Sequence, residues 1–171
     1  QAALFEVMEE KQVTMDGTTY KMEEPFIVLA TQNPIEQEGT YRLPEAQLDR
    51  FLFKVVVDYP NAEEELEIIM REQALENTTK VSKIETIIKG SKIIEFRGLV
   101  NQIKIEHNLL KYIANVVVNT RSNSFLYLGA SPRASIAILS ASKAFAAIEG
   151  RDFVTPEDIK RATIPVLQHR V

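Results

Sequence analysis

Apolar residues follow two different patterns in the two parts of this chain. Before residue 58 they form two short runs rich in aromatic and β-branched residues, an unbroken one at 26–30 and one at 51–57 that is interrupted only by Lys54. Short runs of this kind predict buried strands, as in a parallel sheet. After Tyr59-Pro60, apolar residues recur every three or four positions, which predicts helices. We therefore predict two domains, an α/β part over residues 1–58 and an all-helical part over residues 60–171.

The α/β part opens with a helix and a β-hairpin. Apolar residues at helical spacing predict a helix over residues 1–10. Segments 12–15 and 18–22 flank Asp16-Gly17, a residue pair that supplies two positive φ angles for a type I′ turn. The two-residue loop sets the register, so that the apolar side chains share one face, which we expect to be covered. We assign the hairpin a structural role, with a substrate-facing hairpin as the alternative.

Capping residues delimit the predicted helices. Asn61 and Glu64 form a capping-box pattern. Ser131-Pro132 and Thr155-Pro156 each place a hydroxyl before a proline at the first helical position, and Gly150 ends the long helix at a site that favours a left-handed residue. We expect each apolar stripe to be core. The predicted helices cover about 61–74, 91–102, 108–120 and 132–149, and the last begins at 156 and contains Pro165. Residues 152–154 are predicted to add a short edge strand.

The composition excludes several classes of function. The formal net charge is −4 and the basic residues are scattered, so the chain lacks the basic patch that binds nucleic-acid phosphates. No cysteine is present, which excludes disulfides and thiol nucleophiles. No secretory or membrane-length apolar stretch is visible. We therefore expect a cytoplasmic protein with no membrane span and no nucleic-acid partner.

Several ionisable residues stay unassigned. His107 and His169 lie far apart without metal-ligand spacing, and we predict no metal site in the chain. His169 and Arg170 follow a helix and complement its dipole, which we take as their role. The acidic residues near the polar motif described next fit no magnesium-binding spacing; they are Glu36, Glu38, Glu45 and Asp49.

The richest polar motif reads ATQNPIEQEGTYRLPEAQLDRF, from Ala30 to Phe51. It joins the end of the first predicted strand to a short helix over about 44–49. Ligands bind at the carboxyl ends of strands in open α/β sheets, and Asn33 would lie at such an edge. There its carboxamide could orient a water or contact a phosphate without adding charge. The alternative is an Asn that only forms the turn before Pro34.

This block, with Gly129-Ala130-Ser131-Pro132-Arg133 and the final Val166-Leu167-Gln168-His169-Arg170, resembles MoxR-type AAA+ ATPases over nearly the whole chain. The resemblance implies an α/β remnant of a AAA+ core, with a partial parallel sheet and a β-hairpin, followed by an all-α helical lid domain. It implies ATP hydrolysis coupled to chaperone-like remodelling or activation of partner proteins. It also implies ATP and Mg²⁺ as cofactors, a homo-oligomeric ring, and von Willebrand A-type domain or other client proteins as partners.

Three residues take roles from this resemblance. Asn33 matches sensor 1 and Arg50 the arginine finger, both catalytic, the finger acting in the neighbouring subunit's site. Arg133 matches sensor 2, a nucleotide-binding arginine on the lid. A physical argument supports Arg133 independently, because the positive first turn of a helix disfavours a cation unless an anion is nearby. The alternatives are a surface ion pair with Asp49 or Glu45 for Arg50, and exposure to solvent for Arg133.

A complete nucleotide site needs elements that these 171 residues lack. None of the six glycines belongs to a G-x-x-x-x-G-K-[ST] loop, and no apolar strand ends in Asp-Glu to hold magnesium. The sequence opens without Met inside a predicted helix. We therefore expect the chain to be the carboxyl-terminal part of a larger ATPase and to be inactive alone. A nucleotide-free helical adaptor is the main rival, and a DNA-binding helical domain is disfavoured by the acidic charge.

Overall fold

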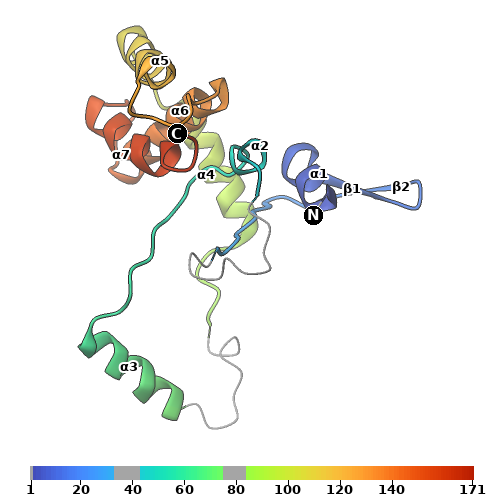
Figure 1. Cartoon of the computed structure of the whole chain (residues 1–171). Coiled ribbons are helices and arrows are strands. Elements are labelled where there is room, and N and C mark those ends of the chain that lie inside the picture. The colour runs from blue at the N-terminus through green and yellow to red at the C-terminus, as the bar shows by residue number, and fades with distance from the viewer. Residues whose placement is uncertain (1, 33–42, 75–83) are drawn as a thin grey trace. The chain divides into compact units, whose positions relative to one another are not determined.

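The computed structural model of the chain describes residues 2–32, 43–74 and 84–171 (Figure 1). These residues form two compact units, of which the first comprises Gln1–Lys54 with Gly90–Val171 and the second Val55–Lys89. Asn33 lies outside the described residues, whereas Arg50 and Arg133 belong to the first unit. The domain boundary between residues 58 and 60 stays a prediction.

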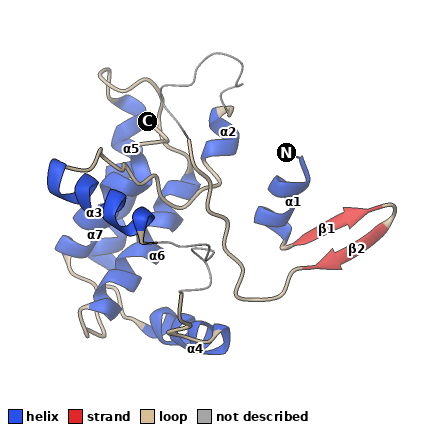
Figure 2. Ribbon diagram, turned by 90° about the horizontal axis from the view of Figure 1, so that it is seen from below, coloured by secondary structure: helices blue, strands red, loops and turns tan. Residues whose placement is uncertain are grey.

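The amino-terminal helix and hairpin form as predicted. Helix α1 (Ala2–Glu10) leads into strands β1 (Gln12–Met15) and β2 (Thr18–Lys21), which pair antiparallel (Figure 2). Asp16 and Gly17 have φ angles of 50° and 76°, as a type I′ turn requires. The described residues leave the tip of the apolar face uncovered, because Met15 and Tyr20 on it are 60% and 55% exposed.

The structure corrects the two strand predictions at 26–31 and 51–57. The described residues of both segments have no regular secondary structure, and Ile27, Leu29 and Val57 are largely exposed. A strand needs a neighbour that takes up its backbone N–H and C=O groups. Within the described ranges, no strand lies beside either segment, and the only sheet is the β1–β2 hairpin. The partial parallel sheet is therefore absent from the described residues.

The core of the first unit is helical. Helix α6 (Pro132–Ile148) contacts α4 (Gly90–Gln102), α5 (His107–Ser122) and α7 (Pro156–Leu167). Its buried face is rich in small residues, which lets neighbouring helices approach closely. The buried apolar residues of this cluster are Ile113, Val117, Ala130, Ala134, Ala137, Ile138, Ala141, Ala146, Val154, Ile159, Ala162, Val166 and Leu167.

The predicted helix ends are confirmed. The Ser131 hydroxyl accepts a hydrogen bond from the Arg133 N–H at 3.2 Å, and Gly150 after α6 has a φ of 71°. Asp158 accepts from the Thr155 N–H at 2.8 Å in the first turn of α7. These contacts are local in sequence, which is why the sequence predicts them well.

Two predictions for the helical part need correction. The apolar stripe of α4 is not core in the described chain, since Ile93 and Phe96 are 41% and 42% exposed. The short strand expected at 152–154 reduces to one parallel bridge between Lys104 and Phe153. No described helix combines the length and the apolar composition that crossing a lipid bilayer requires.

The second unit contains helix α3 (Ala62–Gln73). The predicted capping box forms, because the Asn61 side chain accepts from the Glu64 N–H at 3.0 Å while Glu64 accepts from the Asn61 N–H at 2.9 Å. All residues of α3 are exposed. Among the described residues of this unit, the apolar side chains of α3 therefore form no buried core.

Candidate functional site

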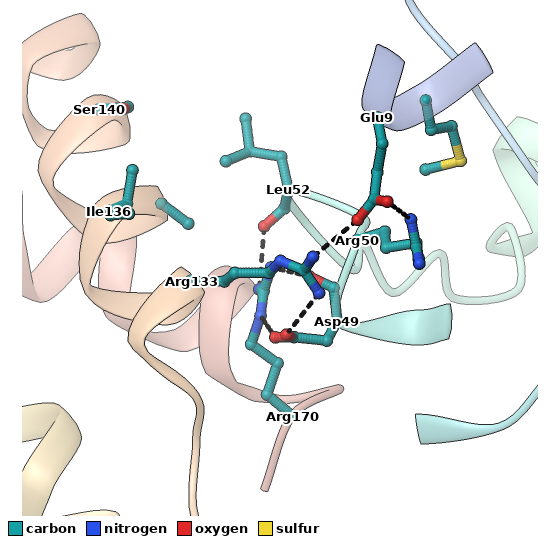
Figure 3. A pocket seen from close by; sticks show the side chains of 10 residues that line it. Glu9, Asp49, Arg50, Leu52, Arg133, Ile136, Ser140 and Arg170 are labelled. Carbon is teal, nitrogen blue, oxygen red and sulfur yellow. Dashed lines mark hydrogen bonds and ion pairs between the residues drawn. The ribbon is translucent and has the colours of Figure 1, made fainter. Parts of the chain in front are cut away.

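A short helix presents two charged residues in different directions. Helix α2 (Glu45–Leu48) follows Pro44, as predicted, and the Pro44 carbonyl accepts from the Gln47 N–H at 2.8 Å. Asp49 and Arg50 come directly after α2. Asp49 interacts with the start of α6, whereas Arg50 interacts with α1 (Figure 3).

Glu9 of α1 brings the two predicted arginines together. Its carboxylate forms an ion pair with Arg50 and another with Arg133, whose Nη2 lies 2.6 Å from Glu9 Oε1 (Figure 3). Residues far apart along the chain thus meet at one anion. The carboxylate that pairs with Arg50 is Glu9, and not Asp49 or Glu45 as the alternative interpretation expected.

Arg50 retains an unused donor. Its side chain is three-quarters buried, and its guanidinium lies 5.8 Å from the centre of the Phe5 ring. Its Nε is buried and has no hydrogen-bond partner among the residues that the structure describes. A buried donor of this kind is costly to leave unpaired. The Nε–H of Arg50 is therefore a hydrogen-bond donor that the described residues leave unpaired.

A pocket of about 270 Å³ lies beside this cluster. Three arginines and two carboxylates line it, so these five groups carry a formal net charge of +1. The first turn of α6 adds a positive helix end next to Arg133. The pocket thus fits an anionic group better than a neutral one. Its lining residues are Met8, Glu9, Asp49, Arg50, Leu52, Arg133, Ile136, Ala137, Ser140 and Arg170.

The loop before α6 positions Arg133. The Ala130 N–H donates to the Thr120 hydroxyl at 2.9 Å, and Arg121 Nε donates to the Ala130 carbonyl at 2.9 Å. A Cβ on Gly129 would lie 2.7 Å from the Arg121 Cα, so this approach requires glycine. The glycine of the predicted motif therefore allows the loop to pack on α5 and to start α6 at a fixed place.

Asp49 is held in its ionised form. Burial opposes its ionisation, but the Ser131 hydroxyl at 2.8 Å, Arg170 and Arg133 outweigh that effect and lower the pKa of Asp49 below its ordinary value. Arg133 Nη1 lies 3.8 Å from Asp49 Oδ2. Asp49 therefore carries a full negative charge at neutral pH.

Arg170 is a site residue that sequence reasoning missed. Its side chain is only 3% exposed and binds the Asp49 carboxylate and the backbone after α2. A role in complementing the dipole of α7 does not account for these contacts. The only signal in the sequence is that Asp49 and Arg170 both belong to the blocks quoted above, since burial of an arginine cannot be derived from local pattern.

His169 supports the same segment. Its Nε2 lies 3.0 Å from the Phe51 carbonyl oxygen. Burial, followed by the neighbouring Arg170 charge, lowers the pKa of His169 below its ordinary value. The imidazole is therefore neutral at physiological pH and can donate one hydrogen bond to that carbonyl.

The described residues offer no group of metal ligands at the pocket. Within the ranges that the structure describes, no three His, Asp or Glu side chains are grouped so that they could hold a metal ion. No residue here is therefore assigned to Mg²⁺.

Profiles of two protein families match the chain. The ATPase family associated with various cellular activities (AAA) matches residues 1–53, which include α1, the hairpin and Arg50. The AAA lid domain matches residues 118–171, which include Arg133 and Arg170. The two matched regions each contribute to the pocket.

Individual proteins are similar over the full chain. An uncharacterized protein, YeaC, of Bacillus subtilis is 42% identical over 171 residues, which are all of this chain and 52% of that protein. The chaperone MoxR1 of Mycobacterium tuberculosis is 42% identical over 180 residues, covering all of this chain and 46% of that protein. This chain thus spans about half the length of these curated relatives.

A crystal structure supports the same relationship. A putative ATPase from Cytophaga hutchinsonii superimposes with a TM-score of 0.87 at 43% sequence identity. The match covers 99% of this chain and 53% of that one. The similarity therefore extends to the fold.

Proposed function

Because the chain belongs to the MoxR-type AAA+ ATPases, with an α/β remnant followed by a helical lid, we propose that it is part of an oligomeric ATPase that remodels or activates other proteins. In that enzyme, ATP binding and hydrolysis change the position of the lid, and partner proteins respond to that movement. Von Willebrand A-type domain proteins are the client class that we propose first.

One observation carries this proposal: Arg50 and Arg133 both pair with the carboxylate of Glu9. Two guanidinium groups that share one carboxylate can also share the oxygens of a phosphate. We propose that a nucleotide phosphate takes the place of Glu9 on these arginines. Arg50 then acts as the arginine finger on the nucleotide of a neighbouring subunit, and Arg133 as sensor 2, which links the phosphate to the lid.

Asn33 completes the proposed catalytic set. It lies outside the described residues, and its role as the sensor 1 amide that orients water is a proposal from the motif. The phosphate loop and magnesium ligands are proposed to lie in the further length that the relatives possess. Mg²⁺, when bound there, would neutralise charge on the phosphates.

The test is ATP hydrolysis by the full-length protein. Replacing Arg50 by alanine should lower kcat by about 10³-fold, as loss of an arginine finger does. The matched control is Arg161→Ala, which removes an exposed arginine of α7 that pairs with Glu149 outside the pocket. An Arg50→Ala enzyme with the kcat of the control would overturn the proposed role.

A mixing experiment tests whether Arg50 acts between subunits. Subunits with Arg50→Ala retain an intact nucleotide site, and subunits with a disabled phosphate loop retain Arg50. Mixing the two inactive proteins should restore part of the ATPase activity if the finger serves a neighbour. No recovery in a demonstrably mixed assembly would contradict an action across the subunit boundary.

A nucleotide-free adaptor is the second candidate function, favoured by the absence of a phosphate loop from these 171 residues. The coding sequence before Gln1 separates the two candidates. A G-x-x-x-x-G-K-[ST] motif there supports the ATPase, whereas a start codon there supports the adaptor.

A further inference from the structure

We propose that Asp49 and Arg170 are positioning residues that fix Arg50 relative to Arg133, so that both arginines move together with the lid. The inference rests on the proposed function of the two arginines. It adds two residues, Asp49 and Arg170, that are not proposed to touch the nucleotide but set the positions of Arg50 and Arg133.

Arg170 binds the whole turn that carries Arg50. Its Nε donates to Asp49 Oδ1 at 2.8 Å, and its Nη2 donates to the carbonyls of Asp49 at 2.9 Å and Phe51 at 2.6 Å. Its Nη1 donates to the Leu52 carbonyl at 3.3 Å and to the Val166 carbonyl in α7. One planar guanidinium therefore holds the backbone on both sides of Arg50 against the carboxyl end of α7.

Asp49 connects the same turn to the start of α6. Its Oδ1 receives Arg170, while its Oδ2 receives the Ser131 hydroxyl at 2.8 Å. Ser131 caps α6 two residues before Arg133. The Asp49 carboxylate thus connects the turn that carries Arg50 to the turn that carries Arg133. Figure 3 shows its contacts with Arg170 and Arg133.

The burial of this pair argues for a geometric role. A buried ion pair gains little stability, because the desolvation of both charges offsets their attraction. Its directional contacts nevertheless restrict the groups it joins to one arrangement. Arg50 and Arg133 reach Glu9 through long side chains with several rotatable bonds, which do not fix the separation of their backbones. Asp49 and Arg170 are placed to set that separation.

The experiment is a double-mutant cycle on kcat in the full-length protein. Arg170→Lys keeps the charge but loses the planar set of donors, and it should lower kcat about 10- to 100-fold, the effect of a misplacement near 1 Å. The KM for ATP should change much less, because the finger acts mainly in the transition state. In an Arg50→Ala background, Arg170→Lys should lower kcat little further, since it acts through Arg50.

Two further variants guard the test against simple unfolding. Asp49→Asn keeps the shape of the side chain and weakens its contacts with Arg170 and Ser131, so it should also lower kcat. It replaces Arg170→Lys in the test if that variant does not fold. Arg151→Lys is the matched control, because it disrupts the two-bond ion pair between Arg151 and Asp158 away from the pocket. All assays are run where circular dichroism shows each variant folded.

The outcomes are distinguishable. Normal kcat in folded Arg170→Lys and Asp49→Asn enzymes, with Arg50→Ala impaired, overturns the positioning role and leaves the proposed function standing. The positioning role is also overturned if the double variant loses kcat by the full product of the two single effects of Arg170→Lys and Arg50→Ala. A loss of kcat in Arg151→Lys as large as in Arg170→Lys overturns it too. Normal kcat in Arg50→Ala instead refutes the proposed function.

Discussion

At the scale of single residues, the site is defined by which carboxylate pairs with which arginine. Glu9 pairs with both proposed nucleotide arginines, whereas Asp49 binds Arg170 and Ser131 and lies farther, 3.8 Å, from Arg133. The two carboxylates therefore have different roles: Glu9 occupies groups that a phosphate could bind, and Asp49 maintains their framework.

Removal of the Glu9 charge should expose the arginines to anions. We predict that Glu9→Gln binds tripolyphosphate a few-fold more tightly than the unmodified chain, since exposed ion pairs are worth at most about 1 kcal/mol. Isothermal titration calorimetry measures this change. The control is Glu10→Gln, which changes the net charge equally at an exposed residue outside the pocket. Equal affinity in both variants would show that Glu9 does not compete with anions.

The framework role of Asp49 predicts a pH dependence of stability. Its pKa is lower in the folded chain than its ordinary value, so its ionised form stabilises the fold above that value and this contribution is lost as the pH falls through the folded pKa. Asp49→Asn should therefore be less stable than the parent chain at pH 7, with the difference shrinking below about pH 4. Urea unfolding at several pH values tests this. The stability difference should be larger at pH 7 than at pH 3, and equal differences at both pH values would contradict the prediction.

At the scale of elements, features decided by neighbouring residues were predicted correctly from the sequence, whereas features that depend on distant segments were not. The Asp16-Gly17 turn and the Ser131-Pro132 start of α6 were predicted correctly, because each is decided by neighbouring residues. The strands at 26–31 and 51–57 were predicted from composition, yet a strand exists only when another strand pairs with it. The apolar stripe of α4 failed for a related reason, because burial depends on a partner surface.

Helix α6 offers a direct test of the core. Ile138 is fully buried between helices, and Ile138→Ala should reduce the free energy of unfolding by about 2–5 kcal/mol through lost burial and a cavity. Ile148→Ala on the same helix removes a side chain that is 73% exposed and should cost about 0.5 kcal/mol or less. Chemical denaturation of both variants makes the comparison. A similar cost for the two would refute the packing of α6.

At the scale of the whole molecule, the pocket joins residues from both matched family regions. Glu9 and Arg50 lie within residues 1–53, and Arg133 and Arg170 lie within residues 118–171. The site is therefore a contact between an α/β part and a lid. Arg50 from the first region and Arg133 from the second meet at the carboxylate of Glu9.

The 171-residue chain should not turn over ATP by itself. It contains arginines that can contact phosphate but no loop that can cradle a triphosphate. A phosphate-release assay on the purified chain should show no hydrolysis above buffer, while the full-length protein should be active. Turnover by the chain that is abolished in Arg133→Ala would contradict this prediction.

The amino-acid sequence alone determined the family, the helix ends, the hairpin register and two of the pocket's arginines, because these depend on local chemistry and on recognisable blocks. Only the tertiary structure decided that Glu9 bridges Arg50 and Arg133, and that Arg170 is buried against Asp49. The physical reason is that ion-pair partners and burial are set by distances between segments that the chain brings together only on folding. Neither quantity is encoded in the spacing of residues along the backbone.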